Sequence, residues 1–301
     1  MNKTEACLMQ RRHTLLVVPL LSIALLALAC APLAEQGRAA DASPQRVLAA
    51  IGERRIVLLG EVHDNATQHA IRAQALRRWF EQGARPTLLM EQFDRERQGD
   101  LDRALAQPRV SADAVIAAAG VQASRPGQGW QWPLYRPYIA LAIEYRLPII
   151  AANVSRADAR RVGSEGLQAL GFDPAVPADI AAAQASEIVD GHCGLLDLAD
   201  ARRLAGAQVA RDQFMARAIE RAAPRGVVLL AGNGHVRSDV GVPRWLTPAT
   251  RQRSVAIGLL EVGESAHEAR FDVVLRTPEQ PRADPCEAMR PASQARGAGG
   301  R

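Results

Sequence analysis

The 301-residue sequence predicts an α/β fold with a mostly parallel central sheet flanked by helices. Three observations support this prediction. Short β-branched or leucine-rich runs recur along the chain, each bounded by Gly, Pro or Asn. Amphipathic helical patterns fill the intervals between these runs. The runs are almost wholly apolar, which is typical of parallel strands that are covered on both faces.

The first 29 residues have the three-part layout of a secretory signal peptide. Lys3, Arg11 and Arg12 supply a positive charge, and an apolar run over 15–28 follows. This run is too short to span a bilayer comfortably. Small residues then precede Cys30, so we expect cleavage before Cys30 and export of the remaining chain.

The sequence around Cys30 allows two products. A cysteine directly after Leu28-Ala29 resembles the bacterial lipobox, in which that cysteine is lipidated and anchors the protein in the bilayer. Ala27 departs from this motif, since a larger aliphatic residue is usual there. The same small residues also suit ordinary signal peptidase. We therefore expect a membrane-anchored lipoprotein, on the periplasmic face of the outer membrane, or a soluble periplasmic protein.

The net charge of +5 does not indicate a nucleic-acid-binding protein. The predicted signal peptide carries three basic residues and one acid, and the stretch 290–301 carries three arginines and no acid. The part between them is close to neutral, so no basic patch remains for nucleic acid. The stretch 290–301 is rich in Gly and Ala and predicts a disordered tail.

Two of the four cysteines remain once Cys7 leaves with the signal peptide and Cys30 carries lipid. Cys193 and Cys286 form an even pair, which in an oxidising compartment predicts a disulfide. Such a bond would attach the C-terminal segment to the middle of the domain. Two free buried thiols are the alternative.

The elements follow in order along a single domain, 44–289, after a tether over 30–43. A first helix is expected from Ser43-Pro44, an N-cap and first-turn pair, to Ile51. Expected strands cover 55–59, 87–90, 147–152, 226–231, 253–261 and 270–276, and expected helices cover 66–82, 94–106, 137–146 and 197–222. The alanine-rich region 155–194 predicts a helical cap. The last two strands are expected to form an antiparallel edge.

Acidic and imidazole side chains follow several of the predicted strands. Ligands bind beyond the carboxyl ends of strands in open α/β sheets, so these side chains are candidates for a shared site. Glycine lets the chain turn sharply at such an end. Two ends contain Gly-x-x-His and two contain a glutamate, and the candidates are Glu61, His63, Glu91 and His235.

This set of residue types suits two kinds of chemistry. Carboxylate oxygens and imidazole nitrogens together can bind a divalent metal. They can also serve as an acid/base pair, in which a carboxylate holds the imidazole in one tautomer. Each histidine taken alone could be an ordinary loop residue. His69 lies early in the following helix, where it would face either the crevice or solvent.

The same segments carry a family resemblance. They are Gly60-Glu61-Val62-His63-Asp64-Asn65 with His69, Glu91-Gln92, Asn153, and Ala231-Gly232-Asn233-Gly234-His235-Val236 with Gly241-Val242-Pro243. Over roughly residues 45–276 the chain resembles the ChaN-like haem-binding lipoproteins of the wider Tiki and erythromycin-esterase-like superfamily. The helix segment that contains Arg211-Asp212 and the segment 190–194 add to this resemblance.

The resemblance implies an α/β fold, haem binding and a role in iron or haem acquisition at the outer membrane. It further implies a homodimer that holds haem through a tyrosine on the iron and a histidine at the propionates. An outer-membrane haem receptor would then be a partner. Other members of the superfamily are hydrolases that use the glutamate and histidine residues, some with a metal.

Carried onto this chain, the resemblance makes Tyr135 the first candidate for an axial tyrosinate and Tyr138 the second. Trp130 and Trp132 would either line a pocket for the flat macrocycle or pack in the core. Core packing is the alternative for Tyr138, and a solvated surface position is the alternative for Arg211. The full set of candidate haem contacts is Tyr135, Tyr138, His63, His69, Asn153, Arg211 and His235.

Two functions remain open from the sequence. The first is a haem-binding lipoprotein without enzymatic activity, with haem as its cofactor. The second is a hydrolase that uses Glu61, His63, Glu91 and His235 as catalytic residues, with or without a divalent metal on the same four side chains. The cluster of acids and histidines favours the hydrolase, because haem binding does not need so many of them. The resemblance and the predicted lipid anchor favour the haem-binding lipoprotein.

Overall fold

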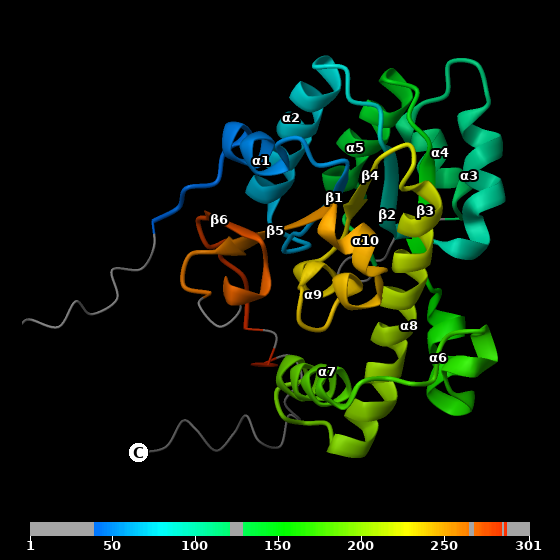
Figure 1. The fold of residues 1–301 in the computed structure, drawn as a ribbon, viewed down its shortest axis with the longest axis vertical. Coiled ribbons are helices and arrows are strands. Elements are labelled where there is room, and N and C mark those ends of the chain that lie inside the picture. The colour runs from blue at the N-terminus through cyan, green and yellow to red at the C-terminus, as the bar shows by residue number, and fades with distance from the viewer. Residues whose placement is uncertain (1–38, 121–128, 265–267, 285, 288–301) are drawn as a thin grey trace, which may run out of the picture. The chain divides into compact units, whose positions relative to one another are not determined.

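A parallel sheet forms the centre of the computed structural model (Figure 1). The structure describes residues 39–120, 129–264, 268–284, 286 and 287. Within them the six strands have the order β3-β2-β4-β1-β5-β6, and every pair of neighbours is parallel. The strands are β1 (Ile56–Leu59), β2 (Thr87–Asp94), β3 (Ile149–Asn153), β4 (Val227–Leu230), β5 (Ser254–Glu261) and β6 (Val273–Thr277). The predicted α/β fold is confirmed.

The expected antiparallel edge is wrong, because β6 pairs with β5 in the parallel sense. The connection between these strands returns the chain to the middle of β5. There Asp272 accepts a hydrogen bond from the Ala256 N–H at 2.7 Å and donates its own N–H to the Ala256 carbonyl at 3.0 Å. Because Asp272 is fixed beside Ala256, β6 begins next to β5 and runs in the same direction.

Helices cover both faces of the sheet, as the apolar strands require. On one face β-strand side chains such as Val57 and Met90 pack with the helices α1 to α5, and on the other Leu58 and Leu229 pack with α8. The helices are α1 (Pro44–Ile51), α2 (Ala66–Glu81), α3 (Gln98–Leu105), α4 (Ala112–Ala118), α5 (Trp132–Glu144), α6 (Arg156–Glu165), α7 (Ala178–Gly191), α8 (Leu198–Ala222), α9 (Asn233–Val236) and α10 (Pro248–Gln252).

Local signals account for most helix starts. Ser43, Asn65 and Asp197 each accept a hydrogen bond from the N–H three residues later, which caps α1, α2 and α8. The helix α5 begins five residues before the predicted start, because Pro133 occupies its first turn, where no N–H partner is needed. Pro137 then lies inside α5 instead of opening it.

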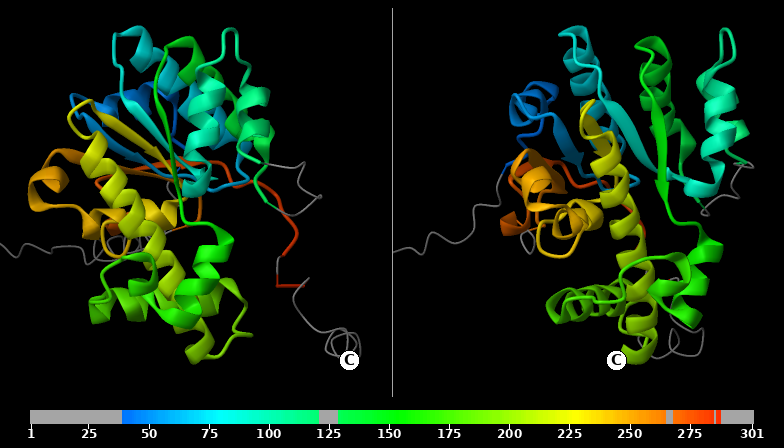
Figure 2. Two further views of the ribbon diagram at one scale, coloured as in Figure 1. Left: turned by 90° about the vertical axis from the view of Figure 1, so that its right-hand side faces the viewer. Right: turned by 45° about the vertical axis from the view of Figure 1, so that its right-hand side comes forward.

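The predicted cap is present as α6, α7 and the N-terminal part of α8 (Figure 2). It has a hydrophobic cluster of its own, in which Val162, Phe172 and Ile180 pack against Val209 and Ala210 of α8. This cluster is separate from the two that cover the sheet. The long α8 contributes residues to the cap cluster and to one of the two sheet clusters. This one helix therefore connects the cap to the sheet.

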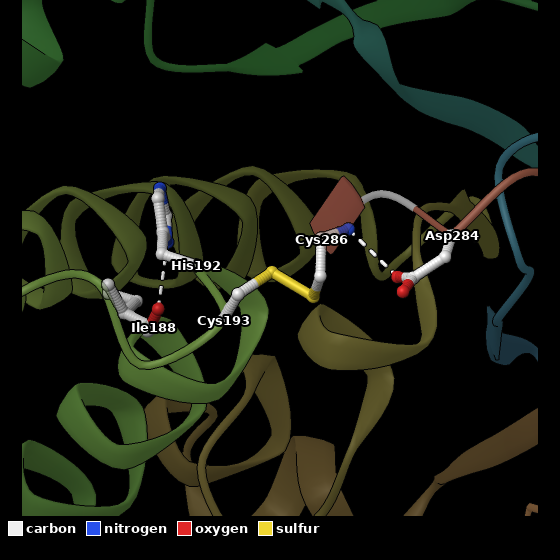
Figure 3. Close-up of a disulfide and its surroundings, with 5 residues drawn as sticks. All are labelled: Ile188, His192, Cys193, Asp284 and Cys286. Atoms are coloured by element: carbon white, nitrogen blue, oxygen red, sulfur yellow. Dashed lines mark hydrogen bonds between the residues drawn. A yellow bond between two sulfur atoms is a disulfide. The ribbon is translucent and has the colours of Figure 1, made fainter. Parts of the chain in front are cut away.

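Cys193 and Cys286 are joined by a disulfide, with an S–S distance of 2.06 Å and Cα atoms 5.6 Å apart (Figure 3). The bond attaches the C-terminal segment to the turn that follows α7. The predicted signal peptide, Cys30 and the tail 290–301 lie outside the described residues. Among the helices that are described, none is both long and apolar enough to cross a membrane.

Candidate functional site

The carboxyl ends of β1, β2 and β4 meet at one edge of the sheet. Leu59 and Met90 both lie beside Leu230, so the residues that follow these strands emerge together. Beyond this edge lies a cavity of about 460 Å³, between the strand ends and the cap. Its lining residues are Glu61, Val62, His63, Gln184, Glu187, Ile188, Gln208, Gly232, Asn233, Gly234, His235, Arg237, Leu260, Glu264 and Phe271.

Glu61 is a buried carboxylate at the end of β1, and three side chains converge on it. Arg72, a fully buried residue of α2, forms an ion pair with its Oε2 atom. The Tyr135 hydroxyl donates a hydrogen bond to its Oε1 atom at 2.6 Å. The same Oε1 atom lies 3.0 Å from Nδ1 of His63. Arg72 and Tyr135 therefore hold Glu61 from the protein interior, and His63 contacts it at the cavity.

His63 presents its imidazole at the edge of the cavity, with 47% of its side chain exposed. An ionised carboxylate can only accept hydrogen bonds, so Nδ1 of His63 carries the proton that Glu61 accepts. In the neutral form of the ring, the lone pair is then on Nε2. The ring packs edge-on against Trp130, with centroids 4.9 Å apart.

Gly232 provides the space that this imidazole occupies. A Cβ atom at position 232 would lie 2.7 Å from Cε1 and 2.9 Å from Nε2 of His63, closer than a real Cβ atom approaches its neighbours. The backbone N–H of Gly232 donates to Oε2 of Glu91 at 2.8 Å. This glycine thus allows close approach of the β1 and β4 ends, for a steric reason that the Gly-x-x-His pattern alone did not specify.

His235 lies between two carboxylates. Its Nδ1 atom is 2.6 Å from Oδ1 of Asp212, a buried residue of α8, and its Nε2 atom is 3.5 Å from Oε1 of Glu91. Burial by itself would lower the pKa of His235, but the charges of Asp212 and Glu91 outweigh burial and raise it well above the ordinary value. The imidazole is therefore an imidazolium at neutral pH.

The two carboxylates respond differently to this imidazolium. Burial would raise the pKa of Glu91, but His235 and the Gly232 N–H lower it to about 2. Burial raises the pKa of Asp212, whose Oδ2 atom is buried and receives no hydrogen bond from the residues that the structure describes. Two carboxylates around one imidazolium leave this side of the cavity with a net negative charge above the pKa of Asp212.

His69 faces the protein interior, not the cavity. Its Nε2 atom lies 3.0 Å from the carbonyl of His63, and its Nδ1 atom lies 3.2 Å from the Tyr138 hydroxyl. Burial lowers the pKa of His69 to about 4, so the ring is neutral at pH 7. Neither the crevice-facing nor the solvent-facing orientation considered from the sequence is adopted.

The two candidate axial tyrosines are buried, and neither lines the cavity. Tyr135 donates its hydroxyl to Glu61, while Tyr138 donates to the carbonyl of His69 at 3.1 Å. Burial raises the pKa of both phenols above the ordinary value. Burial and an acidic neighbour oppose formation of a tyrosinate, so this arrangement does not favour either residue as an iron ligand.

Asn153 and Arg211 also lie away from the cavity lining. Asn153 donates to Oδ1 of Asp94 at 3.1 Å, and Arg211 donates to Oε1 of Gln208 at 3.2 Å. One buried polar atom of each, Oδ1 of Asn153 and Nε of Arg211, has no hydrogen-bond partner among the described residues. Their predicted contact with a cofactor stays a prediction.

The predicted metal site on Glu61, His63, Glu91 and His235 stays a prediction. In the part of the chain that the structure describes, no group of three or more His, Cys, Asp and Glu side chains is arranged to hold a metal ion. Glu61 lies beside His63 and Glu91 beside His235, and three of these four residues, Glu91 excepted, line the cavity. However, Glu61 is engaged by Arg72 and Tyr135, and Glu91 by Gly232 and His235, so the four do not point at a common centre.

Sequence reasoning missed two residues of this site. Arg72 lies three residues after His69 on α2, and this spacing on one face of a helix was the available signal. Asp212 lies among apolar positions of α8, which also was a signal, since an acid on the buried face of a helix needs a partner. From the sequence, its neighbour Arg211 is the candidate site residue instead.

Paired carboxylates and imidazoles thus lie at the carboxyl edge of a parallel sheet, which is where open α/β folds bind their ligands. The model of the family described as "Haem-binding uptake, Tiki superfamily, ChaN" matches residues 47–246, about two thirds of the chain. The chain therefore belongs to this family. No curated protein matches it.

The fold is shared with ChaN of Campylobacter jejuni. That structure superimposes with a TM-score of 0.62 at 19% sequence identity, covering 77% of this chain and 90% of that one. Two further structures superimpose less closely. Erythromycin esterase EreC gives a TM-score of 0.44 at 13% identity, covering 79% and 80%. The type III effector HopBA1 gives 0.46 at 13% identity, covering 79% and 94%.

Arg72→Met should lower the free energy of unfolding by about 3–5 kcal/mol, because it leaves the buried Glu61 charge without its partner. Arg77→Met is the matched control on the same helix. Arg77 pairs with Glu144 at the surface, so its loss should cost about 0–1 kcal/mol. Urea denaturation measures both, and equal losses would contradict the special role of Arg72.

The pH dependence of stability should report on His69. Its pKa is about 4 in the folded protein and about 6.5 when unfolded, so between these values only the unfolded chain binds the proton. The free energy of unfolding should therefore fall by roughly 3 kcal/mol as pH falls through this window. His69→Gln should remove that part of the fall, whereas His192→Gln on the cap should retain it. Chemical denaturation between pH 4 and 7 makes the comparison, and identical pH profiles in wild type and His69→Gln would refute the assignment.

Proposed function

We propose that this chain is an exported haem-binding protein that takes part in haem or iron uptake, with haem bound in the cavity beside His63. Membership of the haem-binding ChaN family supports the choice of ligand. ChaN of Campylobacter jejuni, which shares the fold, binds haem cofacially. In this role the haem is cargo, and its iron is what the protein must hold and release.

The observation that carries the proposal is the orientation of His63. An imidazole that ligates haem iron needs a nitrogen with a free lone pair, and a hydrogen bond on the opposite nitrogen commonly fixes such an imidazole. His63 meets both conditions, since Glu61 accepts its Nδ1 proton and Nε2 is left free. It is also half exposed at the cavity, in contrast to Tyr135. We therefore propose that His63 would hold the haem iron.

The remaining walls suit a flat apolar ligand with charged edges. Val62, Ile188, Leu260 and Phe271 supply apolar surface, and Gln184, Gln208 and Asn233 supply amide donors that propionates could accept from. The cavity volume of about 460 Å³ falls within the range of about 300–1,000 Å³ that is usual for small-molecule sites. His235 lines the same cavity, with its two ring nitrogens turned toward the carboxylates of Asp212 and Glu91.

The cellular part of the proposal depends on the N-terminal sequence. A signal peptide over 1–29 and a lipidated Cys30 would place the domain at the periplasmic face of the outer membrane, on a tether that ends at residue 43. Without lipidation the product would be soluble in the periplasm. A homodimer around the haem and an outer-membrane haem receptor complete the proposal as its partners.

A second candidate function, hydrolysis by the Glu and His residues, is favoured by one specific observation. Two imidazoles line the same cavity, and each is held by a carboxylate. The free Nε2 of His63 could take a proton from water while Glu61 keeps the ring in the required tautomer. The imidazolium of His235 could then stabilise developing negative charge.

Haemin titration of the purified mature domain should shift the Soret band, and His63→Ala should weaken binding at least about tenfold. Tyr145→Phe is the matched control. Tyr145 ends α5 outside the cavity lining and does not contact Glu61 or His63 among the described residues, so this variant should keep both the affinity and the spectrum of the bound state. No shift in the wild-type protein would overturn the haem proposal, and ester hydrolysis lost in His63→Ala would then support the second candidate.

Metabolic labelling with an alkyne fatty acid should mark the wild-type protein in its bacterial host but not Cys30→Ser. Lipid attaches to the thiol at the new N-terminus, so removal of that thiol removes the acyl group. Cys7→Ser changes a cysteine inside the predicted signal peptide and should label normally. Labelling of Cys30→Ser would contradict lipidation at this residue.

A further inference from the structure

The C-terminal strap comprises residues 278–284 and Cys286, which follow β6. It lies beyond residues 47–246, where the family model matches, so the family does not assign it a role. Figure 1 shows this red segment leaving the sheet edge and descending toward α7. Its polar side chains contact segments that border the cavity on different sides.

Gln280 holds the loop that carries His63. Its side-chain nitrogen donates to the carbonyl of Asp64 at 2.7 Å, and its side-chain oxygen accepts from the N–H of Ala66 at 3.0 Å. Its own N–H donates to Oε1 of Glu261 at 3.3 Å. One glutamine thus spans the loop after β1 and the end of β5.

Arg282 joins the same two segments through charge. Its guanidinium contacts both carboxylate oxygens of Asp64, at 2.9 and 2.8 Å, and both oxygens of Glu261, at 2.6 and 2.8 Å. These hydrogen bonds hold the pKa of both carboxyls below the usual range. Glu261 also accepts from Asn65 at 2.6 Å, and Asn65 caps α2. Arg282 therefore stabilises the start of α2 and the loop before it.

The far end of the strap is attached to the cap. Cys286 forms the disulfide with Cys193, just beyond the end of α7, and the neighbouring His192 ring lies 2.7 Å from the carbonyl of Ile188 (Figure 3). Ile188 and Glu187 line the cavity. The strap therefore connects the wall that α7 forms to the loop that carries His63.

We propose that the C-terminal strap is a positioning element of the cavity. Arg282 and Gln280 fix the His63 loop against β5, and the Cys193–Cys286 disulfide extends this hold to α7. The separation between the His63 loop and α7 then depends on contacts outside the cavity. The effect of the strap on haem binding rests on the proposed function. The connection between the His63 loop and α7 does not depend on it.

Hydrogen exchange on the haem-free protein tests the connection directly. Removal of the disulfide in the double variant Cys193→Ala/Cys286→Ala should speed exchange by about tenfold at the last turn of α7 and also in the 62–66 loop. Arg282→Ala should speed exchange in the loop by a similar factor. In the Gln280→Ala/Arg282→Ala background, disulfide removal should no longer affect the loop, because both contacts of the strap with the loop are then absent.

Arg136→Ala is the matched control, since Arg136 forms a two-bond ion pair with Asp113 at a distant surface. It should leave exchange in both segments unchanged. Faster exchange confined to the α7 end when the disulfide is removed would overturn the proposal, because the strap would then only secure the terminus.

Haem titration of the same variants distinguishes the role of the strap from the proposed function. If haem binds beside His63, Arg282→Ala should weaken its affinity by about tenfold, as loss of a supporting residue commonly does. The spectrum of the bound state should also broaden or shift, which a loss of global stability alone would not produce. Absence of haem binding in the wild-type protein would count against the proposed function, while the exchange data would still decide the role of the strap.

Discussion

The buried carboxylate of Glu61 is the constraint on which the rest of the site depends. A charge in the protein interior is costly unless it is paired and hydrogen-bonded. Arg72 supplies the counter-charge, and Tyr135 and His63 share one oxygen of the carboxylate. Side chains from α2, α5 and the loop after β1 are therefore held around this one carboxylate. The orientation of His63 toward the cavity is a consequence of that arrangement.

The two histidines of the cavity are chemically different because their surroundings differ. His63 has one carboxylate partner and substantial exposure, whereas His235 lies between two carboxylates and is an imidazolium. One ring can thus offer a lone pair, and the other can offer a fixed charge. Both the proposed haem binding and the alternative of hydrolysis draw on this difference.

Much of the fold was predictable, because its determinants are local. Apolar runs identified the strands, and the capping residue Ser43 located the start of the first helix. The prediction of an antiparallel edge failed because the direction of β6 depends on Asp272 pairing with Ala256, a contact that no local pattern encodes.

The candidate site was predictable in its membership but not in its internal pairings. The convergence of Glu61 and His235 followed from the rule for strand ends. The position of Tyr135 could not be foreseen, since its burial beside Glu61 is a property of the assembled core.

The sequence by itself determined the fold class, the cysteine pair and the group of acids and histidines that meet beyond the sheet. Periodicity, composition and chain order carry that information, and none of it requires knowledge of distant contacts. Only the tertiary structure decided which residue pairs with which. Arg72 neutralises Glu61, Asp212 pairs with His235, and Arg282 links Asp64 to Glu261 although Arg282 and Asp64 lie 218 residues apart in the sequence. Such pairings depend on how helices pack on the sheet, so they appear only when the chain is folded.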